Sequence, residues 1–172
     1  MKKKIIFLDG DGTLWYPKKT KHTKHPVWIY KDKRYKNYTK HLVMIPSVLP
    51  TIKKLKRKGI ITIILSTHPQ PPKEADTIIK HKLKHFNLTE LFDEVYATKD
   101  YHGSKPKFIL KILKKRKIPK TKALMVGDSY KWDYKPAKSI GVDSLLLESE
   151  YEPMKTKAKT IKKLSDIFKH LS

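Results

Sequence analysis

Two aspartates, Asp9 and Asp11, are separated by a single residue in the stretch DGDGT, directly after the apolar residues 5–8. Carboxylates placed together in this way can divide the work of a reaction. One can attack an electrophile as a nucleophile, and the other can donate or accept a proton. The chain has only 16 acidic residues against 40 lysines and arginines, so two acids at the end of an apolar run indicate a functional site.

Later stretches carry further polar residues that could bind a ligand or take part in a reaction. They are Ser66 and Thr67 at the end of IITIILST, Lys105 in HGSKPKF, and Asp128 and Asp133 in GDSYKWD. If Asp9 lay beside Asp128 and Asp133, the cluster of negative charge would be unfavourable without a cation, and oxygen ligands suit Mg²⁺. Lys105 and a serine hydroxyl can hold an anion next to that cation. Such a combination suits transfer of a phosphoryl group to a carboxylate.

Short apolar runs alternate with helical patterns along most of the chain. Buried strands are predicted at residues 4–8, 60–65, 94–97, 123–126 and 144–147, and helices at 48–58, 73–86, 105–117, 136–141 and a C-terminal stretch. Ser47 is expected to cap the first helix and Gly59 to end it. The C-terminal helix is expected to present Ile161, Leu164, Phe168 and Leu171 on one face.

This alternation predicts an α/β fold: a three-layer α/β/α sandwich whose central parallel sheet is covered on both faces. Parallel sheets bind ligands beyond the carboxyl ends of their strands, which is where Asp9, Ser66 and Asp128 are expected. We expect a single domain over residues 1–172.

Residues 15–45 do not fit the alternation, because they are rich in Lys, His, Tyr and Pro. We expect them to form a small flap over the strand ends. The stretch VWIYKDKRYKNY within it predicts a hairpin, with a turn near Asp32 and Lys33. Because the insertion is short, we expect no full cap domain and an open site.

The composition is strongly basic, with a formal net charge of +24 at pH 7. Such a surface attracts anions, including phosphorylated substrates and nucleic acid, although lysines spread over the whole chain also fit a general compositional bias. The absence of cysteine excludes disulfides and thiolate metal sites. The apolar run at the start is too short to span a membrane, and we expect a cytoplasmic protein with no membrane partner.

Taken in order, DGDGT, a strand-ending Ser-Thr, a lysine before a helix, and GDxxxxD resemble the four motifs of the haloacid dehalogenase superfamily. The resemblance covers residues 5–147 and implies a Rossmann-type sheet. It implies that Asp9 is the nucleophile that forms an aspartyl-phosphate. Asp11 would be the acid and base, with its backbone carbonyl on the metal, and an acid at this position is typical of phosphatases.

The same resemblance implies roles for the later motifs. Ser66, with Thr67, would bind the phosphate, and Lys105 would neutralise nucleophile and phosphate. Asp128 would bind Mg²⁺, supported by Asp133. TLW after the first motif and YHGSK around the third are most similar to the small capless magnesium-dependent phosphatases, although Gly12 replaces a bulkier residue that is common there.

The expected function is therefore hydrolysis of a phosphate monoester, with Mg²⁺ as cofactor. The substrate is a small molecule, a phosphoprotein or a nucleic-acid end. Two alternatives remain open: a phosphotransferase of the same superfamily, and a basic nucleic-acid-binding module on a phosphatase-like scaffold. Individual residues also have simpler explanations. Asp133 can cap the short helix near Pro136, and His81 and His85 are more simply a solvated helix face than a metal site.

Overall fold

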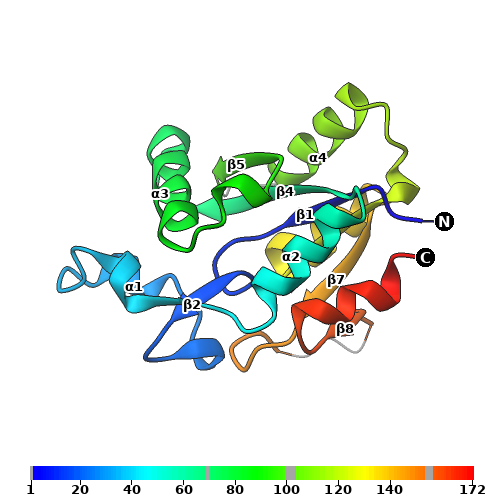
Figure 1. Ribbon diagram of the computed structural model, residues 1–172. Helices are drawn as coiled ribbons and strands as arrows, with labels where there is room; N and C mark the ends of the chain where they lie inside the picture. The colour runs from blue at the N-terminus through cyan, green and yellow to red at the C-terminus, as the bar shows by residue number, and fades with distance from the viewer. Residues whose placement is uncertain (1, 69, 100–103, 154–156) are drawn as a thin grey trace.

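A six-stranded parallel sheet forms the centre of the protein in a computed structural model that describes residues 2–68, 70–99, 104–153 and 157–172 (Figure 1). Its strand order is β5-β4-β1-β6-β7-β8. The strands are β1 (Ile5–Leu8), β4 (Ile61–His68), β5 (Glu94–Lys99), β6 (Ala123–Gly127), β7 (Asp143–Leu147) and β8 (Thr160–Ile161). The parallel sheet and five of its strands were predicted from the sequence, whereas β8 was not.

Helices cover both faces of this sheet, as the alternation of elements predicted. The α-helices of the sandwich are α2 (Val48–Arg57), α3 (Pro72–His85), α4 (Ser104–Lys115) and α5 (Lys135–Ser139). Further helical turns, which are not α-helical, are η3 (Thr89–Leu91), η4 (Lys120–Lys122), η5 (Tyr130–Tyr134) and η6 (Leu164–His170). No helix among the described residues is long and apolar enough to cross a membrane.

The side chains of β1 alternate between two separate cores. Ile5 and Phe7 pack in the cluster that contains residues of α4 and α5, whereas Ile6 and Leu8 pack in the cluster that contains residues of α2, α3 and η6. All four are fully buried. A strand that is apolar on both sides in this way belongs in the middle of a covered parallel sheet, and its carboxyl end therefore lies at the centre of the sheet edge.

Two details of the helices differ from the sequence-based expectation. Ser47 makes no side-chain cap on α2, because its backbone has φ = 73°, and its hydroxyl is buried without a hydrogen-bond partner. Ile161 lies in β8 rather than in a C-terminal helix, where its backbone pairs with β7. Leu164, Ile167 and Leu171 bury the C-terminal turns against the core instead.

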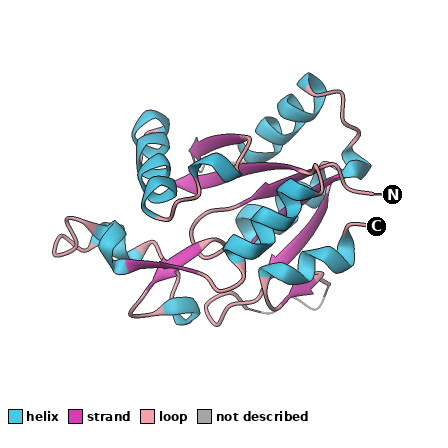
Figure 2. Ribbon diagram, viewed as in Figure 1, coloured by secondary structure: helices cyan, strands magenta, loops and turns pink. Residues whose placement is uncertain are grey.

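The insertion after β1, residues 15–45, is called the flap. Its two ends pair as antiparallel strands, β2 (Trp15–Pro17) and β3 (Leu42–Met44) (Figure 2). Between them lie three helical turns, η1 (Lys21–Thr23), α1 (Trp28–Lys31) and η2 (Tyr38–His41). The insertion is thus a hairpin, but its strands are at the two ends of the segment.

The predicted hairpin within VWIYKDKRYKNY is therefore wrong. A strand would send Ile29 to one face and the two neighbouring aromatic rings to the other. A helical turn instead lets Ile29 become buried while Trp28 packs edge-on against Tyr35 and Tyr30 against Tyr38. Packing inside the flap outweighs the local strand preference of these residues.

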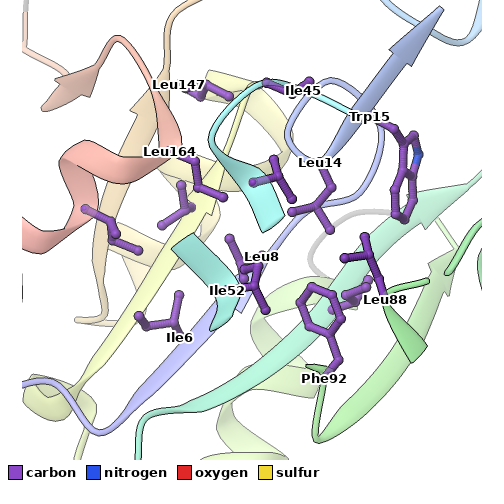
Figure 3. Packing of buried hydrophobic residues seen from close by; sticks show 14 of the residues in the cluster. Ile6, Leu8, Leu14, Trp15, Ile45, Ile52, Leu88, Phe92, Leu147 and Leu164 are labelled. Carbon is purple, nitrogen blue, oxygen red and sulfur yellow. The ribbon is translucent and has the colours of Figure 1, made fainter. Parts of the chain in front are cut away.

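The base of the flap is part of the main core (Figure 3). Leu14 and Trp15 are fully buried and lie in the same cluster as Ile6, Leu8 and Ile52. Trp15 also stacks on Phe86, which follows α3, with 5.9 Å between ring centroids. The residues directly after the DGDGT loop are thus held rigidly by the sheet and by α3.

Candidate active site

The chain turns sharply directly after β1. The amide of Asp9 still donates to the carbonyl of Val126, which continues the pairing with β6, but the amides of Thr13 and Leu14 donate to the carbonyl of Gly10. This turn separates the side chains of Asp9 and Asp11 even though only one residue lies between them. The two carboxyl groups therefore have different neighbours.

Asp9 lies beside two acids from the end of β6 and the turn that follows it. Its carboxyl oxygen and those of Asp128 and Asp133 lie within 4.8 Å of one another. All three residues are buried, with exposed fractions of 6%, 1% and 2%. Their meeting fits the prediction of a site beyond the strand ends, and it follows from the pairing of β1 with β6, two adjacent parallel strands whose carboxyl ends lie at one edge.

Lys105, in the first turn of α4, provides the cation of this cluster. Its ammonium donates to Asp9 Oδ1 at 2.8 Å and also to Asp133 Oδ1. The second oxygen of Asp133 accepts from the backbone amide of Ser129 at 3.1 Å. Asp133 therefore binds both Lys105 and the backbone of its own loop. It does not form the side-chain cap on α5 that the sequence also allowed. We call Asp9, Asp128, Asp133 and Lys105 the Lys105 cluster.

The charges of the Lys105 cluster are not balanced, because three carboxylates face one ammonium. Burial raises the pKa of Asp9 to about 6, although Lys105 opposes the shift. Burial and the charges of Asp9 and Asp133 raise the pKa of Asp128 well above its usual value. The pKa of Lys105 is also raised, because Asp133 and Asp9 outweigh the effect of burial. Without another cation, the cluster therefore holds protons at pH values where isolated carboxyls have lost them.

The donor set of this cluster fits a divalent cation of the hard, oxygen-binding kind. Carboxylate oxygens are the ligands that Mg²⁺ prefers in proteins, and a bound cation would balance the excess negative charge. Asp9, Asp128 and Asp133 are the residues whose side chains would hold it. The side chain of Asp11 lies elsewhere, so only its backbone carbonyl remains a candidate ligand, as the sequence resemblance implied.

Two glycines leave room for the acids of this cluster. Gly12 has φ = +80°, and a Cβ there would lie 2.2 Å from Asp128 Oδ2 and 2.4 Å from the hydroxyl oxygen of Tyr151. A Cβ at Gly127 would lie 2.2 Å from Asp133 Cγ. The glycine at position 12 is thus explained by its positive φ and by the close approach of Asp128 and Tyr151.

Asp11 belongs to a second, separate cluster. Its carboxyl accepts hydrogen bonds from Lys82 Nζ at 2.9 Å, from the hydroxyl of Tyr30, which lies 2.8 Å from both oxygens, and from Trp15 Nε1. Burial raises the pKa of Asp11, but the charges of Lys82 and His68 and the hydrogen bonds from Lys82 and Tyr30 together outweigh it and lower the pKa to about 2. We call Asp11, Lys82, Tyr30 and Trp15 the Lys82 cluster.

The strand-ending hydroxyls face different neighbours. Ser66 is buried beside the DGDGT loop, since a Cβ on Gly10 would lie 3.1 Å from Ser66 Oγ. The hydroxyl of Thr67 instead lies 3.2 Å from that of Thr98 on β5. Of the two predicted phosphate-binding hydroxyls, Ser66 is therefore the one directed at Asp9's loop.

Three residues that contact the acids were not predicted from the sequence to belong to the site: Lys82, Tyr30 and Tyr151. Tyr151 donates its hydroxyl to Asp128 Oδ2. Lys82 had a detectable signal, because it stands three residues after Ile79 and next to Leu83 on the apolar side of α3. Tyr30 and Tyr151 had none, because they approach the acids only through the folding of two distant loops.

Other sequence-based expectations have clear outcomes. The acids are nearly buried, so the site of the free protein is less open than expected, because the flap and Tyr151 lie over it. His81 and His85 are exposed on α3. His68, at the end of β4, is buried, and its Nε2 has no hydrogen-bond partner among the described residues. Residues 101–103 of the YHGSK stretch lie outside the described residues.

Solved structures with this architecture match nearly the whole chain. The "HAD phosphatase" of Thermococcus onnurineus has a TM-score of 0.73 at 20% identity, with 100% of this chain and 98% of that one covered. A protein of Haemophilus somnus described as a "predicted phosphoglycolate phosphatase" has a TM-score of 0.74 at 17% identity, with 100% and 99% covered. At these identities the likeness establishes the fold.

Sequence comparison establishes the family. The chain is 33% identical over 121 residues to a protein of Caldanaerobacter subterraneus subsp. tengcongensis named "Putative pyrophosphatase PpaX"; the match covers 69% of this chain and spans about half, 50%, of that relative. The model of the haloacid dehalogenase-like hydrolase family matches residues 3–147. Because this match includes both acid-bearing strand ends and α4, the chain belongs to the haloacid dehalogenase-like hydrolases.

Proposed function

We propose that this hydrolase is a magnesium-dependent phosphatase that cleaves a phosphate monoester through an aspartyl-phosphate on Asp9. The observation that carries this proposal is the Lys105 cluster, in which a buried carboxylate lies between an ammonium and two further carboxylates. A nucleophile in such a place has a cation site and a lysine next to it, which are the groups that stabilise a transferring phosphoryl group.

In the first step an oxygen of Asp9 attacks phosphorus, the bond from phosphorus to the ester oxygen breaks, and that oxygen leaves as an alcohol after taking a proton. In the second step water attacks the aspartyl-phosphate, gives up a proton, and releases phosphate and free Asp9. Lys105 holds Asp9 and offers positive charge to the phosphoryl oxygens, while the Ser66 hydroxyl binds one of them. A bound Mg²⁺ supplies further charge neutralisation on those oxygens.

Asp11 is the proposed acid of the first step and base of the second. With a pKa of about 2 it is ionised in the free protein, which is the form that the second step needs. For the first step it must gain a proton after the substrate binds. A bound phosphate dianion favours that change, because like charge nearby raises the pKa of a carboxyl.

The test is a screen for phosphate release with and without Mg²⁺, using alkyl and aryl phosphates, phosphopeptides, oligonucleotide ends and inorganic pyrophosphate. Pyrophosphate is included because of the name of the relative described above. We expect Mg²⁺-dependent release from at least one ester and none from the Asp9→Asn protein. Release that persists in the Asp9→Asn protein would overturn the covalent mechanism.

The screen also separates the proposed function from its alternatives. A phosphotransferase would transfer the phosphoryl group to an added alcohol in preference to water, so the ratio of phosphorylated alcohol to free phosphate decides between them. A nucleic-acid-binding module would release no phosphate and would bind oligonucleotides tightly. We favour hydrolysis, because the flap aromatics that could stack on bases already pack inside the flap: Trp28 against Tyr35, and Tyr30 against Tyr38.

A further inference from the structure

Lys82 is a buried lysine that none of the motifs explains. It lies on α3, and its exposed fraction is 0%. Among the described residues only Lys3 and Lys105 are buried lysines besides it. Burying an ammonium costs several kcal/mol, and an apolar residue of similar size at such a position is often neutral or stabilising. The packing of α3 on the sheet therefore does not call for a lysine at this position.

The Lys82 ammonium lies between one carboxyl group and three aromatic rings. Besides Asp11 Oδ1 at 2.9 Å, it donates to the hydroxyl of Tyr30. It also lies 4.5 Å from the ring centroid of Tyr30, 5.5 Å from that of Trp15 and 5.7 Å from that of Tyr38. Aromatic faces attract a cation without offering it any further hydrogen bond. The one charged partner of Lys82 among the described residues is Asp11.

The same contacts determine where the Asp11 carboxyl can lie. All of its side-chain partners come from the flap, its base or α3, and none comes from the Lys105 cluster. The Asp11 carboxyl is thus held on the flap side of the site and does not contact Lys105. An acid must lie on the side where the ester oxygen leaves, since the leaving and attacking oxygens are roughly in line.

We propose that Lys82 is a positioning residue for the reaction: it fixes the Asp11 carboxyl on the flap side, where the ester oxygen leaves and where water later attacks. This inference rests on the proposed function. The leaving group then projects toward the cleft of about 550 Å³ between the flap and α3, which Tyr30, Tyr38 and Glu74 help to line. Tyr30 connects Asp11 with the cleft, because its hydroxyl contacts the Asp11 carboxyl and the same residue lines the cleft.

The decisive variant is Lys82→Met, which keeps the length of the side chain and removes the ammonium. Its rates are measured on phosphate esters with leaving groups from activated aryl alcohols to alkyl alcohols, beside Asp11→Asn. We expect kcat on alkyl phosphates to fall on the order of 10²-fold, the usual size of a proton-transfer contribution, and a smaller loss on activated aryl phosphates. KM should change little, because Lys82 does not belong to the Lys105 cluster.

A double variant distinguishes positioning from a structural role. If Lys82 acts through Asp11, Lys82→Met adds no further loss in kcat to Asp11→Asn, because the group that it positions is already inactive. Lys105→Met is the matched buried-lysine control, and it should slow all esters and multiply with Asp11→Asn. A loss from Lys82→Met that is equal for all leaving groups, a full additional loss in the double variant, or a faster enzyme would each overturn the inference.

A folding measurement completes the set. Asp11→Asn leaves Lys82 buried without its charged partner, so it should lower the thermal midpoint, and adding Lys82→Met should restore much of the loss. If the two substitutions changed the thermal midpoint additively, the result would contradict a direct contact between Asp11 and Lys82. If the unmodified protein releases no phosphate from any ester, the proposed function fails, and this inference fails with it. If only the Lys82 arms fail, the proposed function stands.

Discussion

The Lys105 cluster and the Lys82 cluster each place one acid of DGDGT beside a buried lysine, but they differ in the ratio of acids to lysine. Lys105 contacts two of the three carboxylates in its cluster, whereas Lys82 contacts one and is otherwise surrounded by aromatic rings. The pKa of Asp9 is consequently raised to about 6, and that of Asp11 is lowered to about 2. The first cluster has a place for a further cation, and the second is already neutral.

The comparison teaches that position in the chain does not determine the chemistry of a carboxyl. Asp9 and Asp11 are two residues apart and both are buried, yet their pKa values move in opposite directions because of the groups that distant elements bring to them. Enzymes commonly assign different roles to paired carboxyls in this way. Substitutions that disrupt one cluster and leave the other intact should therefore have different effects.

The largest effect is expected from Asp9→Asn. The amide keeps the shape of the side chain but cannot form the covalent intermediate, so kcat should fall roughly 10⁴- to 10⁶-fold, as when other enzymes lose their nucleophile. Circular dichroism should show an unchanged fold. Phosphate release by the variant within about tenfold of the unmodified protein would be incompatible with Asp9 as nucleophile.

Lys105→Met should produce the next largest loss. It removes the charge that stabilises the transferring phosphoryl group, which is typically worth about 10²- to 10³-fold in kcat, and it should raise KM because the phosphate loses a partner. Steady-state kinetics on two esters of different leaving-group ability provide the measurement. Near-normal kinetics would mean that the lysine of the third motif has another role.

Metal binding should stabilise the folded protein through the Lys105 cluster and not through the Lys82 cluster. Mg²⁺ at about 100 times its dissociation constant should raise the free energy of unfolding by about 2.7 kcal/mol. Asp128→Asn should abolish most of this gain, and Gly12→Ala should reduce it because the new Cβ meets Asp128 and Tyr151. Asp11→Asn is the control that should keep it. Thermal melts with Mg²⁺ and with chelator measure the difference, and equal gains in all variants would contradict the assignment.

The two acids should also contribute to stability with opposite pH dependence in the metal-free protein. The raised pKa of Asp9 makes its contribution greatest below about pH 3.8, and the contribution is lost as the pH rises to about 6. The lowered pKa of Asp11 makes its contribution complete above about pH 3.8, and this contribution is lost as the pH falls to about 2. Each is on the order of 2–3 kcal/mol.

Urea unfolding in the presence of chelator, measured between pH 2.5 and 7, tests this contrast. Asp9→Asn should flatten the profile between about pH 4 and 6, and Asp11→Asn should flatten it below about pH 4. The same flattening in both variants would show that the clusters are not electrically distinct.

The smallest effect should come from salt. Both clusters are buried, and ions screen surface charges beyond about 10 Å at 0.1 M, so turnover of a small ester should change only slightly. Oligonucleotide binding should be weak and should not depend on sequence. Tight binding at physiological salt that is lost when the exposed basic residues of the flap are neutralised would move the proposed substrate to nucleic acid. Exposed basic residues of the flap include Lys18, Lys19, Lys21, Lys31, Lys33, Arg34 and Lys36.

Much of the site was predictable because strand ends in a parallel sheet meet at one edge. The apolar runs before Asp9, Ser66 and Asp128 identify their strands, and the alternation with helices makes those strands parallel. The helix after Lys105 is equally clear from its periodicity. The structure brings these residues together, and their catalytic roles stay predictions until they are tested.

The interior of the flap was not predictable, and the reason is physical. Trp28, Ile29 and Tyr30 have strand-forming side chains, and only their packing against Tyr35, Tyr38 and the base of the flap selects a helical turn. Local preference in such short segments is weak compared with burial.

The amino-acid sequence by itself thus determines the strands and the helix, because hydrophobic periodicity depends on neighbouring residues. It also determines which acids and which lysine stand at the ends of these elements. Which acid meets which lysine was decided by tertiary structure. Asp11 is 71 positions before Lys82, and Asp9 is 96 before Lys105. Pairings over such distances follow from the layout of the sheet, and burial then gives each pair the low-dielectric surroundings that drive the two pKa values apart.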